Sequence, residues 1–224
     1  MEISPGIYRI GGLSFVNAYL VINGPKMLLV DTGMPGSAKK IVNYIRSLGK
    51  NPADVEYIVI THGDIDHIGG AAEMKQLTGA RIAIHAGDAP FLSGESGLRR
   101  VKGPIGAVSN FFTRLLPFRP VAPDILLEDG VEIGGFKIIY TPGHTTGSIC
   151  LYLPRRVIFV GDALSSDSKG NPQPLRKRKY LSTDIAQANA SFKKISQLDF
   201  DICLAGHGTP VIGNASDRLR SLLV

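Results

Sequence analysis

Residues 61–67, with the sequence THGDIDH, constrain the fold and the chemistry of this chain more than any other segment. They directly follow residues 55–60 (VEYIVI), an apolar run that is typical of a buried strand. The carboxyl ends of strands are where loops leave an α/β sheet and functional side chains gather. Two histidines and two aspartates at such a strand end can face two neighbouring centres, and these ligand types suit zinc, iron or manganese. The segment therefore predicts a metal site.

Other candidate ligands stand at the ends of other strand-like runs. Of the five histidines in the chain, His144 and His207 also end apolar runs beside glycine. Asp31 and Asp162 end their runs in the same way. Each histidine alone would fit an ordinary hydrogen-bonded core or surface residue, but the set together predicts a metal centre with two positions. His85 lacks such company, and we interpret it as structural.

Strand-like and helical patterns alternate along the chain, with no linker between them, and predict one α/β domain over residues 1–224. Each half gives strands followed by helices, as two sheets between helical layers would require. Strands are expected at 6–10, 17–22, 26–30, 55–60, 81–84, 124–127, 131–133, 136–140, 149–153, 157–160 and 201–205. Helices are expected at 37–48, 70–77 and 183–198, and from residue 214 onward.

Regularity fails over residues 88–123, which we expect to form a lid-like insertion. Glycines and prolines punctuate it, yet it retains Phe111, Phe112, Leu115, Leu116 and Phe118. Phe111 and Phe112 are candidates for substrate contact, because an aromatic roof would suit an acyl chain. A satellite core or the contact of a homodimer fits these side chains equally well.

Charge indicates an anionic partner only weakly. The chain carries 25 Lys and Arg against 19 Asp and Glu, a net charge of +6, and four of the basic residues form the run RKRK at 176–179. A solvated loop explains such a run, and an electrostatic funnel for an anionic substrate is the functional alternative, with the neighbouring Tyr180 as a candidate substrate contact. A nucleic-acid surface would need basic residues on several elements, so we expect a small-molecule substrate instead.

Targeting signals and membrane spans are not evident in the sequence. No stretch approaches the roughly 20 apolar residues of a membrane span, and the start lacks a basic region followed by an apolar run, so we expect a cytoplasmic protein. The two cysteines, Cys150 and Cys203, lie inside apolar runs and are expected to be buried thiols.

Five motifs along nearly the whole chain resemble, in order, those of the metallo-β-lactamase superfamily. They are DTG at 31–33, THxDxDHxGG at 61–70, TPGHTxGS at 141–148, GD at 161–162 and GHG at 206–208. The resemblance implies a four-layer αβ/βα sandwich of two mixed β-sheets flanked by helices. It also implies two divalent metal ions at one edge between the sheets.

The resemblance assigns a role to each motif residue. His62, Asp64 and His144 would bind the first metal, and Asp66, His67 and His207 would bind the second. Asp162 would bridge the two. Asp66 would also orient a bridging hydroxide and exchange a proton as the intermediate collapses, and Asp31 would hold a ligand in place.

Asp64 departs from the family pattern, which usually has histidine at this position. A carboxylate can still ligate, and the flavodiiron proteins, which have Glu there, use iron. We therefore expect a shift of metal preference from zinc toward iron or manganese. The alternative is that the shorter side chain fails to reach, which would leave the first position weak or empty.

Hydrolysis of an ester, thioester or lactone is the chemistry that the resemblance favours, by attack of a metal-activated hydroxide. A mononuclear iron dioxygenase acting on persulfides is the main alternative, since it resembles the same fold with fewer metal ligands. A nuclease or phosphodiesterase and a non-catalytic metal-binding module rank below these two. Fold and motifs alone do not select the substrate.

Overall fold

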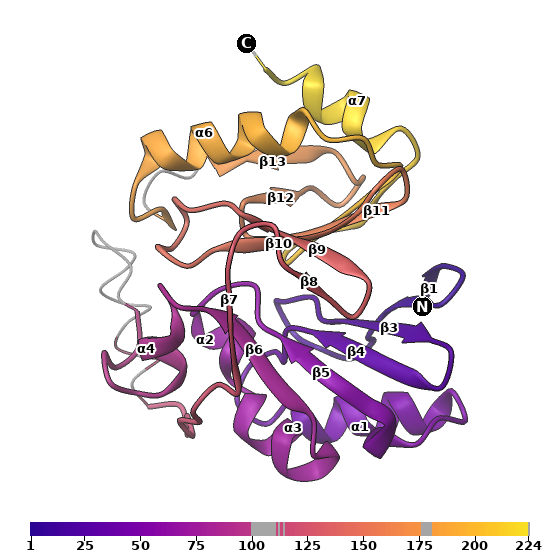
Figure 1. Cartoon of the computed structure of the whole chain (residues 1–224), viewed down its shortest axis with the longest axis vertical. Coiled ribbons are helices and arrows are strands. Elements are labelled where there is room, and N and C mark those ends of the chain that lie inside the picture. Colours follow the sequence, from indigo (N-terminus) through magenta and orange to yellow (C-terminus); the bar gives the residue numbers. More distant parts are fainter. Residues whose placement is uncertain (100–110, 112, 114, 176–180, 224) are drawn as a thin grey trace.

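Two β-sheets pack face to face between outer layers of helices (Figure 1). This computed structural model describes every residue except 100–110, 112, 114, 176–180 and 224. The strands of the first sheet, in both spatial and chain order, are β1 (Glu2–Ser4), β2 (Ile7–Arg9), β3 (Tyr19–Asn23), β4 (Lys26–Val30), β5 (Val55–Val59), β6 (Arg81–His85) and β7 (Ile125–Leu127). Neighbours are antiparallel from β1 to β4 and parallel from β4 to β7.

The second sheet has the spatial order β15-β14-β11-β10-β9-β8. Its strands are β8 (Glu132–Ile133), β9 (Phe136–Tyr140), β10 (Ile149–Leu153), β11 (Val157–Gly161), β14 (Ile202–Ala205) and β15 (Val211–Ile212). Only the β11–β14 pair is parallel among the described strands of this sheet. A separate ribbon pairs β12 (Leu164–Ser166) with β13 (Pro172–Pro174).

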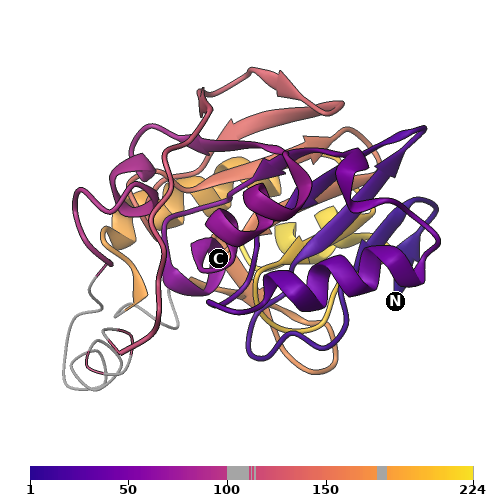
Figure 2. The same cartoon turned by 90° about the horizontal axis from the view of Figure 1, so that it is seen from below.

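Helices cover the outer face of each sheet. Helix α1 (Ala38–Ser47) and helix α3 (Ala71–Thr78) lie across the first sheet, as the view from below shows (Figure 2). Helix α6 (Ile185–Ser196) and helix α7 (Ala215–Arg220) cover the second. The short elements are a 3₁₀ turn (Pro52–Asp54), α2 (Ile65–Ile68) and α4 (Ala89–Leu92). The expected four-layer sandwich is thereby confirmed.

Strand β3 illustrates how the sequence builds two apolar layers at once. Successive side chains of a strand point to opposite faces of the sheet. Tyr19 and Val21 accordingly enter the core between the two sheets, whereas Leu20 packs on the side of α1 and α3. Because both faces are covered, all three positions are buried and apolar.

Several short elements differ from the sequence-based expectation, which also did not include β1, the 3₁₀ turn or α4. The motif segment 61–67, expected to be a loop, enters helix α2 at Ile65, so Asp66 and His67 lie on a helical turn. The β12–β13 ribbon was not expected, since β13 consists of Pro172, Gln173 and Pro174 and proline is depleted in strands. Strand β15 has only two residues, too few for any periodicity to be read.

The segment 88–123 partly rejoins the body of the molecule. Phe91, Leu92, Phe118 and Val121 pack against the core under α1 and α3. Phe111 is 63% exposed. The role of this segment as a lid stays a prediction.

Both cysteines are free and buried, as the sequence predicts. Burial raises the pKa of the Cys150 thiol to about 12 and also raises that of Cys203. In the part of the chain that is described, no helix has the length and apolar character needed to cross a membrane.

Phe159 of β11 joins the two sheets, and its truncation should destabilise the fold strongly. Its ring is fully buried, 5.4 Å from the Tyr19 ring in the first sheet and 5.5 Å from the Phe136 ring in the second. Phe159→Ala is expected to lower the free energy of unfolding by about 3–5 kcal/mol, because a cavity opens in the shared core. Urea denaturation of the metal-free protein measures this loss. Leu126→Ala, at a site 58% exposed, is the control and should change stability by less than about 0.5 kcal/mol; equal losses would contradict the prediction.

Candidate metal centre

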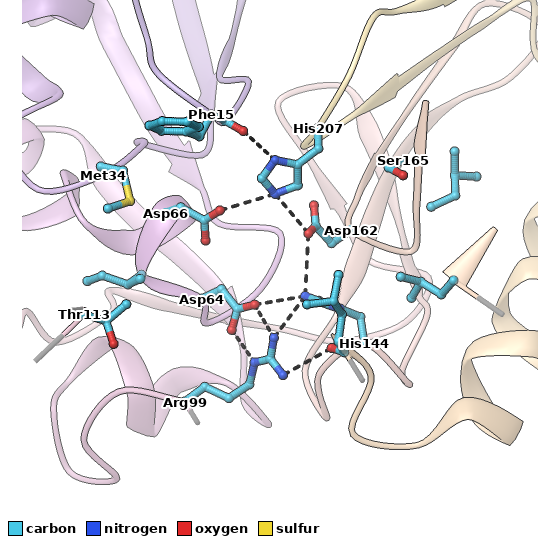
Figure 3. Close-up of a pocket in the computed structure, with 14 residues that line it drawn as sticks. Phe15, Met34, Asp64, Asp66, Arg99, Thr113, His144, Asp162, Ser165 and His207 are labelled. Atoms are coloured by element: carbon cyan, nitrogen blue, oxygen red, sulfur yellow. Dashed lines mark hydrogen bonds and ion pairs between the residues drawn. The ribbon is translucent and has the colours of Figure 1, made fainter. Parts of the chain in front are cut away.

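Four strand ends and one loop bring the motif residues to one edge of the sandwich. Asp31 follows β4, and residues 61–67 follow β5. From the second half, His144 lies in the β9–β10 connection, Asp162 follows β11 and His207 follows β14. The halves of the chain thus contribute to one cluster of side chains from opposite sides (Figure 3).

Asp31 is the hydrogen-bonding hub of the first half. Its carboxylate accepts the Thr61 backbone N–H at 2.8 Å and the Thr61 hydroxyl at 2.8 Å. It also accepts the His67 Nδ1–H at 2.8 Å. Asp31 is 2% exposed and holds a left-handed backbone with φ 61°, which turns its side chain from the end of β4 toward the motif. These contacts are the ones that the expected role of Asp31, to hold a ligand in place, requires, and that role stays a prediction.

Three histidines have their Nδ1 atoms engaged, which leaves their Nε2 atoms free for a metal. His67 Nδ1 binds Asp31, and His62 Nδ1 lies 3.0 Å from the Thr61 hydroxyl oxygen, whose own proton goes to Asp31. His207 Nδ1 donates to the Phe15 carbonyl at 2.6 Å. An acceptor at Nδ1 selects the tautomer whose Nε2 lone pair can ligate. This is the arrangement that metal-binding histidines need.

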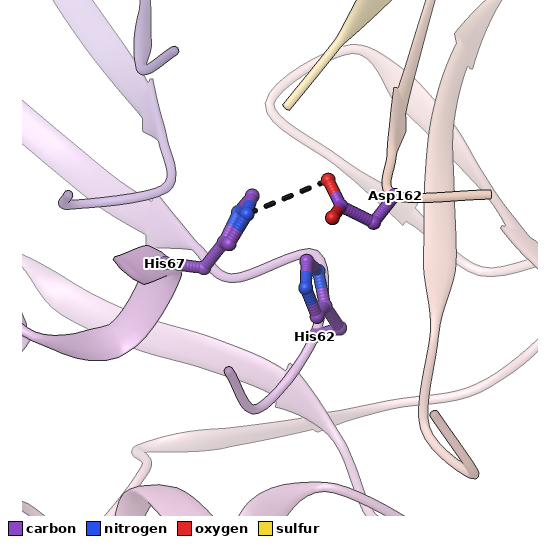
Figure 4. A group of neighbouring side chains, drawn as sticks. All are labelled: His62, His67 and Asp162. Atoms are coloured by element: carbon purple, nitrogen blue, oxygen red, sulfur yellow. Dashed lines mark ion pairs between the residues drawn. The ribbon is translucent and has the colours of Figure 1, made fainter. Parts of the chain in front are cut away.

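The residues expected to form the second metal position, together with Asp162, lie close to one another. His207 Nε2 lies 3.3 Å from Asp66 Oδ2 and 3.2 Å from Asp162 Oδ2. His67 Nε2 lies 3.5 Å from Asp162 Oδ1 (Figure 4) and 3.9 Å from Asp66 Oδ2. Ligands at about 2.0–2.1 Å from a tetrahedral ion stand about 3.3 Å apart, so the spacing fits a metal ion. His67 Nε2 and Asp162 Oδ1 are also buried without a hydrogen-bond partner within the protein, which fits atoms that bind a metal ion.

The group expected to form the first metal position, His62, Asp64 and His144, is also in contact with an arginine. Asp64 Oδ2 lies 3.0 Å from His144 Nε2 and 3.6 Å from His62 Nε2. The Arg99 guanidinium binds both oxygens of Asp64 in a short bidentate contact, through Nε and Nη2. Arg99 was not anticipated from the sequence, because it lies in the irregular segment and 35 residues from Asp64.

Charges in the cluster stabilise one another. Burial opposes ionisation of Asp162, but His207 and His67 hold the pKa of its carboxyl well below the usual value. Burial alone would lower the pKa of His67, yet Asp31 and Asp66 raise it to about 9. In the same way Asp162 and Asp66 raise the pKa of His207 to about 11 against the effect of burial. Positive charge therefore stabilises the carboxylates of the cluster. A metal ion provides that charge when these histidines release their protons.

Asp88 is a second hub that sequence reasoning missed. Its side chain is fully buried and accepts the Gly63 and Gly147 backbone N–H groups at 2.8 Å each. It also accepts the Thr145 hydroxyl at 2.5 Å. Asp88 thus ties the motif loop of the first half to the loop that carries His144. No local pattern marks such a residue, because its partners are 25 to 59 residues away.

A cavity of about 390 Å³ opens over the cluster. Asp64, Asp66, His144, Asp162 and His207 face it. Apolar side chains form much of the remaining wall, namely Phe15, Met34, Ile65, Leu164, Leu175 and Leu181. A small molecule with an apolar part can therefore lie against the metal positions.

None of the candidate substrate contacts chosen from the sequence is among the described residues that line this cavity. Phe111 is largely exposed and is not among the described residues that line this cavity. Phe112, Tyr180 and the basic run 176–179 lie outside the described residues. His85 stacks on Tyr140 with ring centroids 4.4 Å apart and accepts the Gly87 N–H, which agrees with its structural interpretation.

Comparisons with known proteins agree with the geometry. The family model described as the metallo-beta-lactamase superfamily matches residues 11–207. A probable metallo-hydrolase, YflN of Bacillus subtilis (strain 168), is 29% identical over 202 residues, which cover 83% of this chain and 76% of that protein. A metallo-beta-lactamase of Cronobacter sakazakii has a similar structure, with a TM-score of 0.71, 28% identity, and coverage of 92% of this chain and 77% of that chain.

One relative carries a more specific activity in its name. A hydroxyacylglutathione hydrolase of Francisella tularensis subsp. novicida (strain U112) is 29% identical over 160 residues, or 69% of this chain. The match covers 50% of that relative, so this chain spans about half of its length in the alignment.

Removal of the Asp88 carboxylate should loosen both metal-binding loops. Asp88→Ala leaves two backbone N–H groups and a hydroxyl without their acceptor, at about 1–3 kcal/mol for each buried group. We expect a loss of stability above about 2 kcal/mol and a metal affinity about 10–100-fold weaker, as for other partners that orient ligands. Urea denaturation and calorimetric titration with Zn²⁺ measure the two effects. Asp129→Ala removes an exposed carboxylate of similar type, with 53% exposure, and should leave metal affinity unchanged; equal affinity in both variants would refute the positioning role.

Proposed function

The chain belongs to the metallo-β-lactamase superfamily and is a metallo-hydrolase, and we propose that its substrate is a small-molecule ester, thioester or lactone. The observation that carries this proposal is the convergence of four histidines and three aspartates, in three overlapping groups with the spacing of metal ligands, beneath an open cavity. A site with ligands on one side and an open cavity on the other leaves room for water and substrate together.

Divalent metal ions bound in such a site supply a hydroxide nucleophile near neutral pH and stabilise negative charge on the substrate oxygen. The protein provides the geometry for this chemistry. We propose Asp162 as the residue shared between the two positions, since its Oδ2 lies 3.2 Å from His207 Nε2 and 3.7 Å from His144 Nε2. Asp31 and the Phe15 carbonyl orient His67 and His207 through their Nδ1 atoms.

Asp66 is proposed as the residue that moves a proton. Its carboxylate lines the cavity and lies 3.3 Å from His207 Nε2, so it reaches both the second metal position and a substrate. His67 and His207 hold the pKa of Asp66 below its usual value although burial and the neighbouring carboxylates act against this. An ionised Asp66 can orient the attacking water, accept its proton and pass it to the leaving group.

The cavity and the relatives support an acyl substrate. Its apolar wall suits the carbon skeleton of an acyl group, while the polar side chains gather at the metal end. The hydroxyacylglutathione hydrolase among the relatives favours a thioester within this class. Zinc, iron and manganese all suit the mixed imidazole and carboxylate ligands.

The test is a hydrolase screen combined with metal quantification. The full chain, loaded in turn with Zn²⁺, Mn²⁺ or Fe²⁺, is assayed with p-nitrophenyl esters, acyl thioesters and lactones. Asp162→Ala should lose bound metal and at least about 100-fold in kcat/KM together, because both positions share this carboxylate. Asp217→Ala, which removes a carboxylate that is 70% exposed on α7, is the matched control and should retain both.

Two results would overturn the proposal. Full turnover by Asp162→Ala would remove the shared carboxylate from the chemistry. Bound iron with oxygen consumption on glutathione persulfide, and no hydrolysis of any ester, thioester or lactone, would instead assign the persulfide dioxygenase activity.

A further inference from the structure

We propose that Arg99 is the resident cation of the first metal position, so that the protein binds one metal ion tightly at the second position and a further ion only when Arg99 is displaced. The inference deepens the metal site of the proposed function and rests on it. It concerns how many ions the site holds and which residue decides that number.

Contacts of the guanidinium place it among the ligands of the first position. Arg99 Nε and Nη2 bind the two oxygens of Asp64, and Nη2 also lies 3.4 Å from His144 Nε2. Arg99 Nη1 donates to the Leu181 carbonyl at 3.3 Å, which anchors the far side of the group. Figure 3 shows the guanidinium beside the Asp64 carboxylate and the His144 ring, which also contact each other directly. Two of the three ligand side chains are thus already in contact with a positive charge.

Burial makes this pairing strong. The Arg99 side chain is 6% exposed and the Asp64 side chain is 17% exposed. A guanidinium pairs with a carboxylate through two parallel hydrogen bonds, the strongest geometry for such a pair. A buried arginine needs this acceptor, since an unpaired charge in the interior is costly. A metal ion at the first position would have to take Asp64 from Arg99 or bind beside its positive charge.

Charge balance explains why the arginine is there. The family pattern has a neutral histidine where this chain has Asp64, so the aspartate adds one negative charge to the first position. Arg99 adds one positive charge at the same place and restores the balance. We therefore regard Asp64 and Arg99 as one charge-compensating pair rather than as two unrelated residues.

The second position has no such competitor among the described residues. Asp66, His67 and His207 contact one another and Asp162, and no arginine or lysine contact to them is observed there. Buried ligand atoms without a hydrogen-bond partner occur in both positions, namely His62 Nε2 in the first and His67 Nε2 and Asp162 Oδ1 in the second, so the difference between the positions rests on Arg99. The two positions are therefore unequal, although their ligand sets are similar in number.

Counting bound metal in Arg99 variants tests the inference directly. The full chain is stripped with a chelator, dialysed against buffered Zn²⁺ and analysed by mass spectrometry for zinc, with calorimetric titration for the affinities. We expect one tightly bound Zn²⁺ per wild-type chain and a second at least about 10-fold weaker. In Arg99→Gln the second Zn²⁺ should tighten by about 10-fold or more, a size typical of changes next to metal ligands. Arg99→Lys keeps the charge without the planar fork and should fall between the two.

Controls separate a local effect from a general one. Arg81→Gln removes an exposed arginine that pairs with Glu56 at 3.1 Å, far from the cavity, and should match the wild type. Within the site, His144→Ala should retain the tight ion, whereas His207→Ala should lose it. Circular dichroism verifies folding of each variant. If Arg99→Gln fails to fold, the double variant Asp64→His/Arg99→Gln provides the second test, because it removes both members of the charged pair and should also bind two ions tightly.

Three outcomes are decisive against the inference. Two equally tight Zn²⁺ ions in the wild type would show that Arg99 does not compete. A weaker second ion in Arg99→Gln would show that Arg99 supports Asp64 as a ligand. Loss of the tight ion in His144→Ala but not in His207→Ala would show that the tight ion binds at the first position and not at the second. A different result would contradict the proposed function. In that case the wild type would bind no Zn²⁺, Mn²⁺ or Fe²⁺ and would hydrolyse none of the esters, thioesters or lactones.

Discussion

The buried carboxylate of Asp31 is the interaction on which the metal centre depends. It connects the end of β4 to the segment after β5, because it accepts two hydrogen bonds from Thr61 and one from His67. Through the Thr61 hydroxyl its influence extends to Nδ1 of His62. Thr32 adds a backbone N–H and a hydroxyl bond to the His67 carbonyl, so the DTG and THGDIDH motifs form one hydrogen-bonded unit. A single strand end thereby sets the orientation of two ligands in different positions.

The second half of the chain is attached to this unit at the same edge. Asn17 donates to the Ala205 and Gly208 carbonyls at 2.9 Å each. Close packing explains the glycine before His207, since a Cβ at Gly206 would lie 2.4 Å from Asp162 Oδ1 and 2.5 Å from the His67 ring. The absence of a side chain at Gly206 therefore lets His67 of the first half and Asp162 of the second half approach each other closely. A metal ion bound there would link the halves, so metal binding and stability of the fold are coupled.

Sequence reasoning predicted the candidate ligands that the structure brings together, but not the residues that organise the first position. Strand-end histidines and aspartates are visible in the sequence because the apolar runs before them are regular, and β4, β9 and β10 have the expected boundaries. Asp88 and Arg99 lie in an irregular segment, and their partners come from distant parts of the chain. A buried contact between such residues is set by tertiary packing, on which periodicity carries no information. The extra charge of Asp64 was the available signal, since a buried carboxylate calls for a cation.

Asp64 and Arg99 together change what the first position contributes to catalysis. In a pair of metal positions, each ion helps to activate water and to stabilise the developing negative charge on the substrate. A guanidinium cannot activate water in this way, but its donors can stabilise an oxyanion at short range. Arg99 lines the cavity beside Asp66 and Asp162, so it stands on the side from which substrate must approach. On the proposal that Arg99 occupies the first position, a metal ion held at the second position would supply the activated water, and Arg99, which lines the same cavity, would supply positive charge near the substrate.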